Sequence, residues 1–256
     1  MSRSFKAIIK RNLPVHAIHN LLTVSVPDSM PAPQPGQFFM VEVNKGTDPL
    51  LKRAFSLFRN TEEGIQILYR VRGKGTGILK NMKEGAVVDM LGPLGNFYPM
   101  PPEDKTPLII AGGIGIASVF SLVERLAGRA IVFYGARTRE DLLMLKEVKQ
   151  LAKEVIVSTD DGSAGAKGTV ADSLLAFLAN PQSPISNHCI YACGPHPLLK
   201  ALSHSAREYR IRTYVSLEEH MACGIGACLG CVVKTDDGYK RVCKEGPVMN
   251  AMEISW

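Results

Sequence analysis

The chain has no long apolar run and few aromatic residues. No stretch approaches the roughly 20 apolar residues that a membrane-spanning helix needs, so the sequence predicts no membrane partner. Aromatic residues make up 7% of the chain, and Lys and Arg are scattered among Glu and Asp rather than gathered into a stripe. The net charge of +6 therefore does not indicate a nucleic-acid partner, and it fits a solvated surface with some bias toward anionic cofactors.

The N-terminal residues also lack the apolar core of a signal peptide, since the chain opens with Met1-Ser2-Arg3-Ser4-Phe5-Lys6. Six cysteines are present, but disulfides form mainly in exported proteins. We therefore expect a cytoplasmic protein whose cysteines have another use. The 256 residues are enough for two domains with cores of their own and a small appendage. Neither an internal repeat nor a low-complexity stretch is present.

Four of the cysteines are grouped near the C-terminus as C-x4-C-x2-C-x11-C, at Cys223, Cys228, Cys231 and Cys243. The first three reproduce a spacing with which thiolates hold a [2Fe–2S] cluster. The intervening glycines favour this interpretation, because a loop folded around a cluster needs unusual φ angles and backbone N–H groups directed at the sulfurs. The short distance to Cys243 predicts a module smaller than a plant-type ferredoxin.

Two other uses of these cysteines are weaker. A structural zinc site favours two C-x2-C pairs, and only one such pair is present. Disulfides would require export. The remaining cysteines lie elsewhere in the chain: Cys189 is expected to be a buried apolar residue, and Cys193 is either a structural thiol or the border of a nucleotide site.

Residues 1–101 have the pattern of a small antiparallel β-barrel. Short apolar runs at 7–9, 21–26 and 38–43 are separated by turn residues, including the proline-rich segment 31–36. Prolines and charged residues that follow this region mark a linker.

From about residue 106 the pattern changes to alternating strands and helices. The apolar run 107–111 is typical of a parallel strand buried on both faces. Further elements are expected as strands at 130–134, 155–159 and 189–193, and as helices ending at 126 and covering 141–152. Residues 102–213 are therefore expected to form a doubly wound parallel-sheet nucleotide domain, and residues 214–256 a small [2Fe–2S] module.

A glycine turn follows the first of these strands. Gly112, Gly113 and Gly115 stand where a strand passes into a helix, and such a turn lets a pyrophosphate approach the backbone and the helix N-terminus. Ser118 replaces the third glycine of the full dinucleotide fingerprint, so an ordinary strand-to-helix turn is the alternative. A second candidate segment ends a later strand, at the sheet edge where open α/β folds bind ligands: Cys193, Gly194 and Pro195.

Charged residues follow two other strands. Asp160 and Asp161 would repel a 2′-phosphate and accept a hydrogen bond from a free ribose hydroxyl, which favours NADH over NADPH. Arg137 is the counter-evidence, and an ordinary turn explains the two acids equally well.

The barrel has two segments suited to a flavin nucleotide, at 53–56 and 68–76. Arg53 can pair with a pyrophosphate, Phe55 or Tyr69 can lie against a flavin ring, and Ser56 can hydrogen-bond its edge. Gly-x-x-Thr at 73–76, opening a predicted helix, is a second phosphate cradle. From the residues alone, surface arginines and core aromatics explain the same pattern equally well.

The combination of these motifs resembles the ferredoxin–NADP reductase superfamily. The matching motifs are Arg-x-Phe-Ser, Gly-x-x-Thr, Gly-Gly-Ile-Gly and Cys-Gly-Pro, in this order along the chain. The segments 92–97, 159–163 and 216–228 narrow the resemblance to the electron-transfer subunits of class B dihydroorotate dehydrogenases, over essentially the whole chain. Pro is more common in this family than Ala117 or Ser118, so the chain departs from the pattern at the start of the helix.

The resemblance implies FAD in the barrel, NAD(H) in the second domain and a [2Fe–2S] cluster in the C-terminal module. It places FAD contacts at Arg53, Ala54, Phe55, Ser56, Leu68, Tyr69, Arg70, Gly75 and Thr76. It places cluster ligands at Cys223, Cys228, Cys231 and Cys243. The implied partner is an FMN-containing dihydroorotate dehydrogenase catalytic subunit, in a two-plus-two heterotetramer.

The predicted function is electron transfer between NAD(H) and the FMN of that catalytic subunit, through FAD and the cluster, in pyrimidine biosynthesis. No residue suggests a general base for dihydroorotate, so that chemistry is expected in the partner. The alternative is a reductase subunit of the same architecture that serves another redox partner. A binding module stabilised by zinc is a further alternative, and it predicts a colourless protein.

Overall fold

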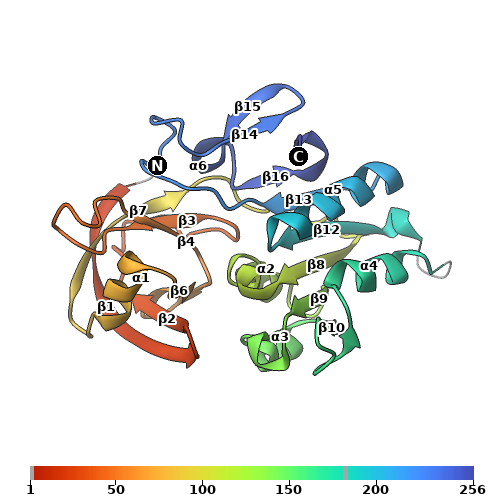
Figure 1. Ribbon diagram of the computed structural model, residues 1–256, viewed down its shortest axis with the longest axis horizontal. Coiled ribbons are helices and arrows are strands. Elements are labelled where there is room, and N and C mark those ends of the chain that lie inside the picture. Colours follow the sequence, from red (N-terminus) through yellow and green to blue (C-terminus); the bar gives the residue numbers. More distant parts are fainter. Residues whose placement is uncertain (1–2, 181–183) are drawn as a thin grey trace.

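The structure of the protein is a computed structural model that describes residues 3–180 and 184–256. Its N-terminal part is a curved antiparallel sheet of seven strands in the order β4-β3-β7-β1-β2-β6-β5 (Figure 1). The elements are β1 (Arg3–His16), β2 (His19–Val24), β3 (Phe38–Val41), β4 (Arg53–Ser56), β5 (Arg59–Thr61), β6 (Gly64–Arg70), α1 (Lys74–Asn81) and β7 (Val87–Leu94). Alternate residues of β7 are buried, because successive side chains of a strand point to opposite faces. The expected barrel is confirmed.

A second seven-stranded sheet follows, in the order β11-β10-β9-β8-β12-β13-β16. The sheet elements are β8 (Thr106–Gly112), β9 (Ile131–Ala136), β10 (Glu154–Thr159), β11 (Ala166–Lys167), β12 (His188–Cys193) and β13 (Thr213–Ser216), all parallel. The α-helices between them are α2 (Ile116–Leu126), α3 (Leu145–Leu151), α4 (Val170–Leu178) and α5 (His196–Tyr209). Short 3-10 turns are η1 (Gly113–Gly115), η2 (Arg139–Asp141) and η3 (Ile185–Asn187).

Strand β8 is buried on both faces of this sheet, as the apolar run predicted. Leu108 and Ile110 pack on the side that also holds Leu174 of α4, whereas Ile109 packs on the side of Phe120 in α2. Helices therefore cover both faces of the sheet, which confirms the doubly wound nucleotide domain.

The C-terminal residues form a small module that returns to this sheet. A hairpin of β14 (Val232–Thr235) and β15 (Gly238–Arg241) leads into α6 (Val242–Glu245), and β16 (Val248–Asn250) and η4 (Ala251–Glu253) close the chain. Strand β16 pairs antiparallel with β13, which makes the sheet mixed, a feature that the sequence did not indicate. Because the sheet holds both ends of the module, the intervening loop lies beside both the barrel and the nucleotide domain (Figure 1).

Helix α2 also joins the barrel to the nucleotide domain, since it lies between the two sheets (Figure 1). The rings of Phe58 and Phe120 are 4.3 Å apart. The guanidinium carbon of Arg59 lies 4.6 Å from the centre of the Phe120 ring, and Arg59 Nη2 is 2.8 Å from Glu124 Oε1. These contacts make one continuous core across two sheets.

One expected helix is shorter than predicted. The pattern placed it over 141–152, but the helix α3 covers Leu145–Leu151. Leu142 and Leu143 are buried without being helical, and the carbonyl of Leu143 accepts a hydrogen bond from Tyr134 (3.1 Å). The apolar residues that suggested an earlier helix start are therefore core contacts of a turn. Among the described residues, no helix is long and apolar enough to cross a membrane.

Candidate cofactor sites

The four predicted cluster ligands lie in the C-terminal module. Cys223 and Cys228 stand in irregular backbone, Cys231 directly precedes β14, and Cys243 is in α6. The loop that holds the first two rests on the barrel, because a Cβ at Gly224 would lie 2.6 Å from Cγ of Met40. Gly224 has a φ of +71°, a conformation that glycine adopts without steric cost.

Backbone N–H groups of this loop point at the cysteine sulfurs. Cys223 Sγ accepts hydrogen bonds from the N–H groups of Ile225 (3.5 Å), Ala227 (3.3 Å) and Cys228 (3.5 Å). Cys243 Sγ accepts one from Gly226 (3.1 Å). Burial opposes ionisation of Cys223, but the N–H donors and the side chain of Cys228 together outweigh it and lower the pKa of this thiol to about 6. N–H groups placed in this way favour a thiolate, which is the form that binds metal.

The other two sulfurs also accept backbone hydrogen bonds: Cys231 Sγ from the N–H of Cys243 (3.4 Å) and Cys228 Sγ from the N–H of Gly230 (3.5 Å). Within residues 3–180 and 184–256, no three His, Cys, Asp or Glu side chains already stand in the arrangement of a bound metal site. All six cysteines are free thiols. Four free cysteines in one module, with backbone N–H groups directed at their sulfurs, fit a [2Fe–2S] cluster, in which four cysteines share two iron atoms.

The predicted phosphate cradle of the barrel combines Arg53 with the start of α1. A Cβ at Gly75 would lie 2.6 Å from Arg53 Nε, so the guanidinium lies directly over the first turn of this helix. Thr76 Oγ1 accepts hydrogen bonds from the N–H groups of Arg72 (2.9 Å) and Gly73 (3.1 Å) and thereby fixes the turn. A guanidinium beside the N-terminus of a helix is suited to a pyrophosphate, and the residues therefore fit FAD.

The two aromatic candidates differ in what they offer a flavin. Their rings are 5.6 Å apart, but Tyr69 is only 2% exposed and donates its hydroxyl proton to Asn12 Oδ1 at 3.0 Å. Burial raises the pKa of Tyr69 to about 12. Phe55 and Ser56 are half-buried, so of the two rings that of Phe55 is the one free to meet a ligand. Asn12 was not anticipated from the sequence.

The remaining FAD candidates have different surroundings. Ala54 and Arg70 are exposed, beside the cradle and at the end of β6. Leu68 is 3% exposed and packs into the core shared with the nucleotide domain. Any contact between Leu68 and FAD would therefore involve its backbone.

The two segments predicted to bind NAD abut each other. A Cβ at Gly115 would lie 2.2 Å from the carbonyl oxygen of Cys193, and one at Gly194 would lie 3.1 Å from the backbone nitrogen of Gly112. By contrast, nothing lies within 4 Å of a Cβ built on Gly113. The glycines thus serve two purposes: they allow the turns to touch, and they leave one side open for a nucleotide. Pro195 is exposed at this edge and begins α5 as its N-cap.

Cys193 itself is 1% exposed. Burial, followed by the charge of Glu218, raises the pKa of its thiol, so it stays neutral. The side chains of Ser118 and Ser216 oppose this rise in the pKa of Cys193, and neither serine was predicted from the sequence to contribute there. In the sequence, the only sign of a role for Ser118 is that it replaces the third glycine of the dinucleotide fingerprint.

The acids after β10 lie beside the end of β9. The N–H of Asp160 donates to the carbonyl of Ala136 (3.1 Å), and that of Asp161 donates to Arg137 (3.3 Å). The carboxylate of Asp161 accepts hydrogen bonds from the backbone and hydroxyl of Ser163 (2.9 and 2.7 Å). Asp161 therefore holds its own turn, and the exposed Asp160 is the acid left available to a ribose.

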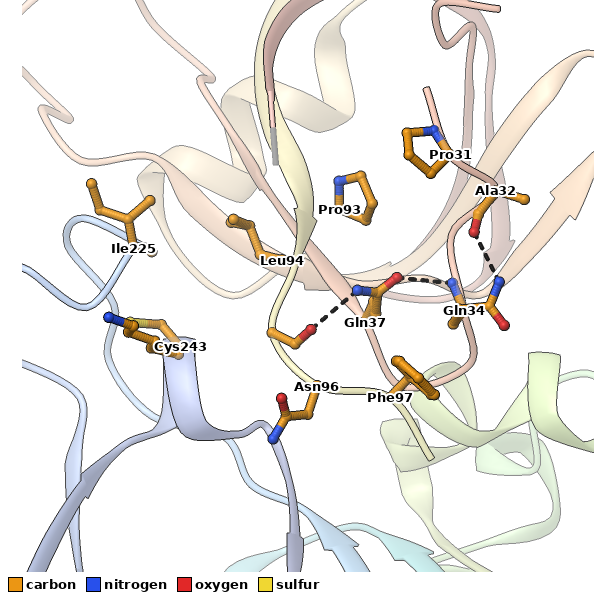
Figure 2. Close-up of a pocket in the computed structure, with 13 residues that line it drawn as sticks. Pro31, Ala32, Gln34, Gln37, Pro93, Leu94, Asn96, Phe97, Ile225 and Cys243 are labelled. Atoms are coloured by element: carbon orange, nitrogen blue, oxygen red, sulfur yellow. Dashed lines mark hydrogen bonds between the residues drawn. The ribbon is translucent and has the colours of Figure 1, made fainter. Parts of the chain in front are cut away.

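A pocket of about 530 Å³ lies between the cysteine loop and the edge of the barrel. Ile225 and Cys243 face it from the loop side, with Leu94 and Phe97 on the barrel side (Figure 2). The segment that contains Phe97 is held to the module, since Asn96 Nδ2 donates to the carbonyl of Glu245 (2.6 Å). The pocket places one predicted cluster ligand beside an opening to solvent, and it contains none of the predicted FAD or NAD contacts.

A curved barrel, a nucleotide-binding sheet and a cysteine module packed on both define a reductase of the ferredoxin–NADP reductase type. A family model described as the oxidoreductase NAD-binding domain matches residues 109–204, and one described as the iron-sulfur cluster binding domain of dihydroorotate dehydrogenase B matches residues 218–255.

Two relatives carry the name dihydroorotate dehydrogenase B (NAD(+)), electron transfer subunit. The one from Caldanaerobacter subterraneus subsp. tengcongensis is 41% identical over 226 residues, covering 87% of each chain. The one from Desulforamulus reducens is 36% identical over 265 aligned positions and 100% of each chain. The chain belongs to the family of electron-transfer subunits of dihydroorotate dehydrogenase B.

Solved structures show the same architecture more widely. The structure of the NADH-dependent reduced ferredoxin-NADP oxidoreductase, described for flavin-based electron bifurcation, has a TM-score of 0.84 and 28% identity, covering 98% of this chain and 90% of its own. The ferredoxin reductase of carbazole 1,9a-dioxygenase has a TM-score of 0.68 at 20% identity, covering 82% and 67%, and it shows the fold alone.

Proposed function

We propose that this chain transfers electrons between NAD(H) and the FMN of a dihydroorotate-oxidising catalytic subunit, through FAD and a [2Fe–2S] cluster, in pyrimidine biosynthesis. The similarity to electron-transfer subunits over the whole chain supports the proposal. One structural observation supports it most directly: the cysteine loop packs on the barrel at Met40, and the same barrel continues into the core that carries the glycine turn.

Bound FAD supplies hydride exchange with nicotinamide and single-electron exchange with a cluster. The chain has to hold the two nucleotides and the cluster in fixed relative positions. Arg53, Gly75 and Thr76 provide the anion site for FAD, with Phe55 and Ser56 beside it; the further FAD contacts proposed are Ala54, Leu68, Tyr69 and Arg70. Gly112, Gly113, Gly115, Cys193, Gly194 and Pro195 bind NAD.

Asp160 favours NAD over NADP in this scheme, because a carboxylate repels a 2′-phosphate and accepts a hydrogen bond from a ribose hydroxyl. Cys223, Cys228, Cys231 and Cys243 hold the cluster. The functional division of the chain is 1–101 for FAD, 102–213 for NAD and 214–256 for the cluster.

The proposed partner is an FMN-containing catalytic subunit in a two-plus-two heterotetramer in the cytoplasm. The test is orotate-dependent oxidation of NADH by this chain co-expressed with a dihydroorotate dehydrogenase catalytic subunit of the same organism. We expect activity only when both subunits are present, and a complex whose mass by light scattering corresponds to two copies of each. Iron content, FAD content and NADH-dependent reduction of an artificial acceptor are the controls.

A second candidate is a reductase subunit of the same architecture for another redox partner. The similarity to the NADH-dependent reduced ferredoxin-NADP oxidoreductase over 98% of this chain favours it as the alternative. Intact cofactors and good reduction of an artificial acceptor, without orotate reduction and without a complex, would contradict the dihydroorotate partner and support this alternative.

A further inference from the structure

Four polar side chains meet at a buried point behind the two turns predicted to bind NAD. Ser118 and Ser216 are each 2% exposed, and Tyr98 and Cys193 are each 1% exposed. Ser118 Oγ donates to Ser216 Oγ at 3.1 Å, and the Tyr98 hydroxyl donates to the carbonyl oxygen of Ala192 at 3.3 Å. The side chains of both serines also oppose the effect of burial on the pKa of the Tyr98 hydroxyl and of the Cys193 thiol. We call these four residues the buried hydroxyl cluster.

Each member comes from a different part of the fold. Tyr98 lies on the segment from the barrel to the nucleotide domain, and Ser118 is in the first turn of α2. Cys193 ends β12 and Ser216 ends β13. The residues that follow Cys193 form the Cys-Gly-Pro turn, and those that follow Ser216 lead into the cysteine loop. The cluster therefore joins the barrel, the glycine turn, the Cys-Gly-Pro turn and the cysteine module.

Packing alone does not require these hydroxyl groups. A buried polar group is costly unless it is hydrogen-bonded, and a fully satisfied network fixes one arrangement of the segments that contribute to it. Burial raises the pKa of both Tyr98 and Cys193, so both remain neutral hydrogen-bonding groups. Ser121 is a contrast on the same helix: it is 7% exposed, and its hydroxyl finds no hydrogen-bond partner in the described part of the chain.

The cluster lies behind two turns that almost touch, the glycine turn and the Cys-Gly-Pro turn. The glycine turn touches the backbone of Cys193 so closely that a Cβ at Gly115 would lie 2.2 Å from its carbonyl oxygen. Ser118 follows that turn by three residues and is hydrogen-bonded to Ser216. Displacements of about 1 Å at a site where two reactants must meet reduce rates by roughly a hundredfold.

We propose that Ser118 and Tyr98 are positioning residues, which hold the Cys-Gly-Pro turn against the glycine turn and thereby set where the nicotinamide lies relative to the flavin. The inference rests on the proposed NAD and FAD sites, but not on the identity of the partner subunit. It also explains why serine stands at the position of the third fingerprint glycine: there the side chain makes a hydrogen bond across the sheet edge.

The experiment compares Ser118→Ala and Tyr98→Phe with Ser121→Ala, in the complete subunit containing FAD and iron. Flavin reduction by NADH is followed by stopped flow without the catalytic subunit, NAD binding is measured by titration calorimetry, and backbone hydrogen exchange is measured at both turns. Because no dihydroorotate-oxidising partner is used, a wrong partner assignment leaves the result unaffected, and it would be revealed separately by the orotate assay.

We expect Ser118→Ala and Tyr98→Phe to reduce flavin at a rate at least about tenfold lower, with NAD affinity changed by less than about threefold, because the pyrophosphate contacts remain. Hydrogen exchange should increase at residues 112–116 and 193–198. Ser121→Ala should match the unmodified chain in all three measurements. If Ser118→Ala does not fold, Tyr98→Phe decides, since it removes only one oxygen atom. Rates and exchange equal to those of Ser121→Ala in the variants that fold would overturn the proposal.

Discussion

At the scale of single residues, Cys228 offers the cleanest test of the cluster assignment. It is exposed, whereas Cys231 and Cys243 are buried, so replacing it removes a ligand without opening a cavity in the core. We expect Cys228→Ala to lose its iron and its visible iron–sulfur absorbance while keeping FAD, because the cradle around Arg53 lies in the barrel. Iron and FAD content per chain are the measurements.

Cys189→Ala is the matched control. Cys189 is 1% exposed, and its Sγ lies 3.7 Å from the hydroxyl of Tyr191, so it is a packed thiol far from the loop in sequence. Its replacement should lower the free energy of unfolding by about 1 kcal/mol and leave the iron content unchanged. Full iron occupancy in Cys228→Ala, or loss of iron in Cys189→Ala as well, would contradict the ligand set.

The cysteine positions could be predicted from the sequence because ligand spacing is local. Three of the four ligands lie within nine consecutive residues, and the glycines between them allow the required φ angles. The roles of Ser118 and Ser216 could not be predicted in this way. These residues are 98 positions apart, and only the pairing of β12 with its neighbours brings them together.

At the scale of elements, α1 contains two glycines that can be compared directly. A Cβ at Gly75 would lie 2.6 Å from the guanidinium of Arg53, whereas nothing lies within 4 Å of a Cβ at Gly77. Replacing either glycine by alanine favours a helix by up to about 1 kcal/mol. Because the atoms near Gly75 are the end of a flexible side chain, Gly75→Ala should displace Arg53 rather than unfold the barrel.

We therefore expect Gly75→Ala to weaken FAD binding by about tenfold or more, since the charged hydrogen bonds of a displaced guanidinium are worth about 1.5–3 kcal/mol. Gly77→Ala should raise the unfolding midpoint slightly and bind FAD with unchanged affinity. The FAD affinity can be measured from the flavin fluorescence that appears on release, and the unfolding midpoint can be measured by urea titration. Equal FAD affinity in the two variants would show that the binding role of Arg53 does not depend on the absence of a side chain at Gly75.

Element positions followed well from the sequence where the hydrophobic pattern was continuous. Strand β8 and the end of α2 at Leu126 lie where the pattern put them. The predicted start of α3 was wrong because Leu142 and Leu143 are buried in the core from a turn that precedes the helix. The antiparallel strand β16 has only three residues, too few for its pattern to be distinguished from a loop, and its place depends on contact with β13.

At the scale of the whole molecule, the barrel and the nucleotide domain are coupled through a shared interface that also buries ionisable groups. His19 of β2 is 7% exposed. Burial lowers its pKa, as does the nearby charge of Arg70 in β6 and, more weakly, that of His16 in β1, while Asp141 of η2 and a hydrogen bond to the backbone of His16 oppose the shift. The imidazole of His19 is therefore harder to protonate in the folded chain than in the unfolded chain.

The consequence for stability has a definite sign. At a pH well above about 6.5, the ordinary pKa of histidine, His19 is neutral in both the folded and the unfolded chain and contributes no pH dependence. As the pH falls below that value, the unfolded chain binds a proton before the folded chain does, and the free energy of unfolding decreases. The decrease continues until the pH reaches the lowered pKa of the folded state. His188, whose pKa burial also lowers, acts in the same direction.

We therefore expect the urea midpoint of the complete subunit to fall between about pH 7.5 and about pH 5.5, and His19→Gln to reduce this fall without abolishing it, because His188 remains. Glutamine retains an N–H donor for the backbone of His16 but does not titrate in this range. The same substitution at the exposed His204 is the control and should preserve the full pH dependence. If His19→Gln followed the unmodified chain at both pH values, the burial of His19 would not be the source of the acid sensitivity. A reduced fall in His19→Gln alone would place that source at this buried histidine of β2.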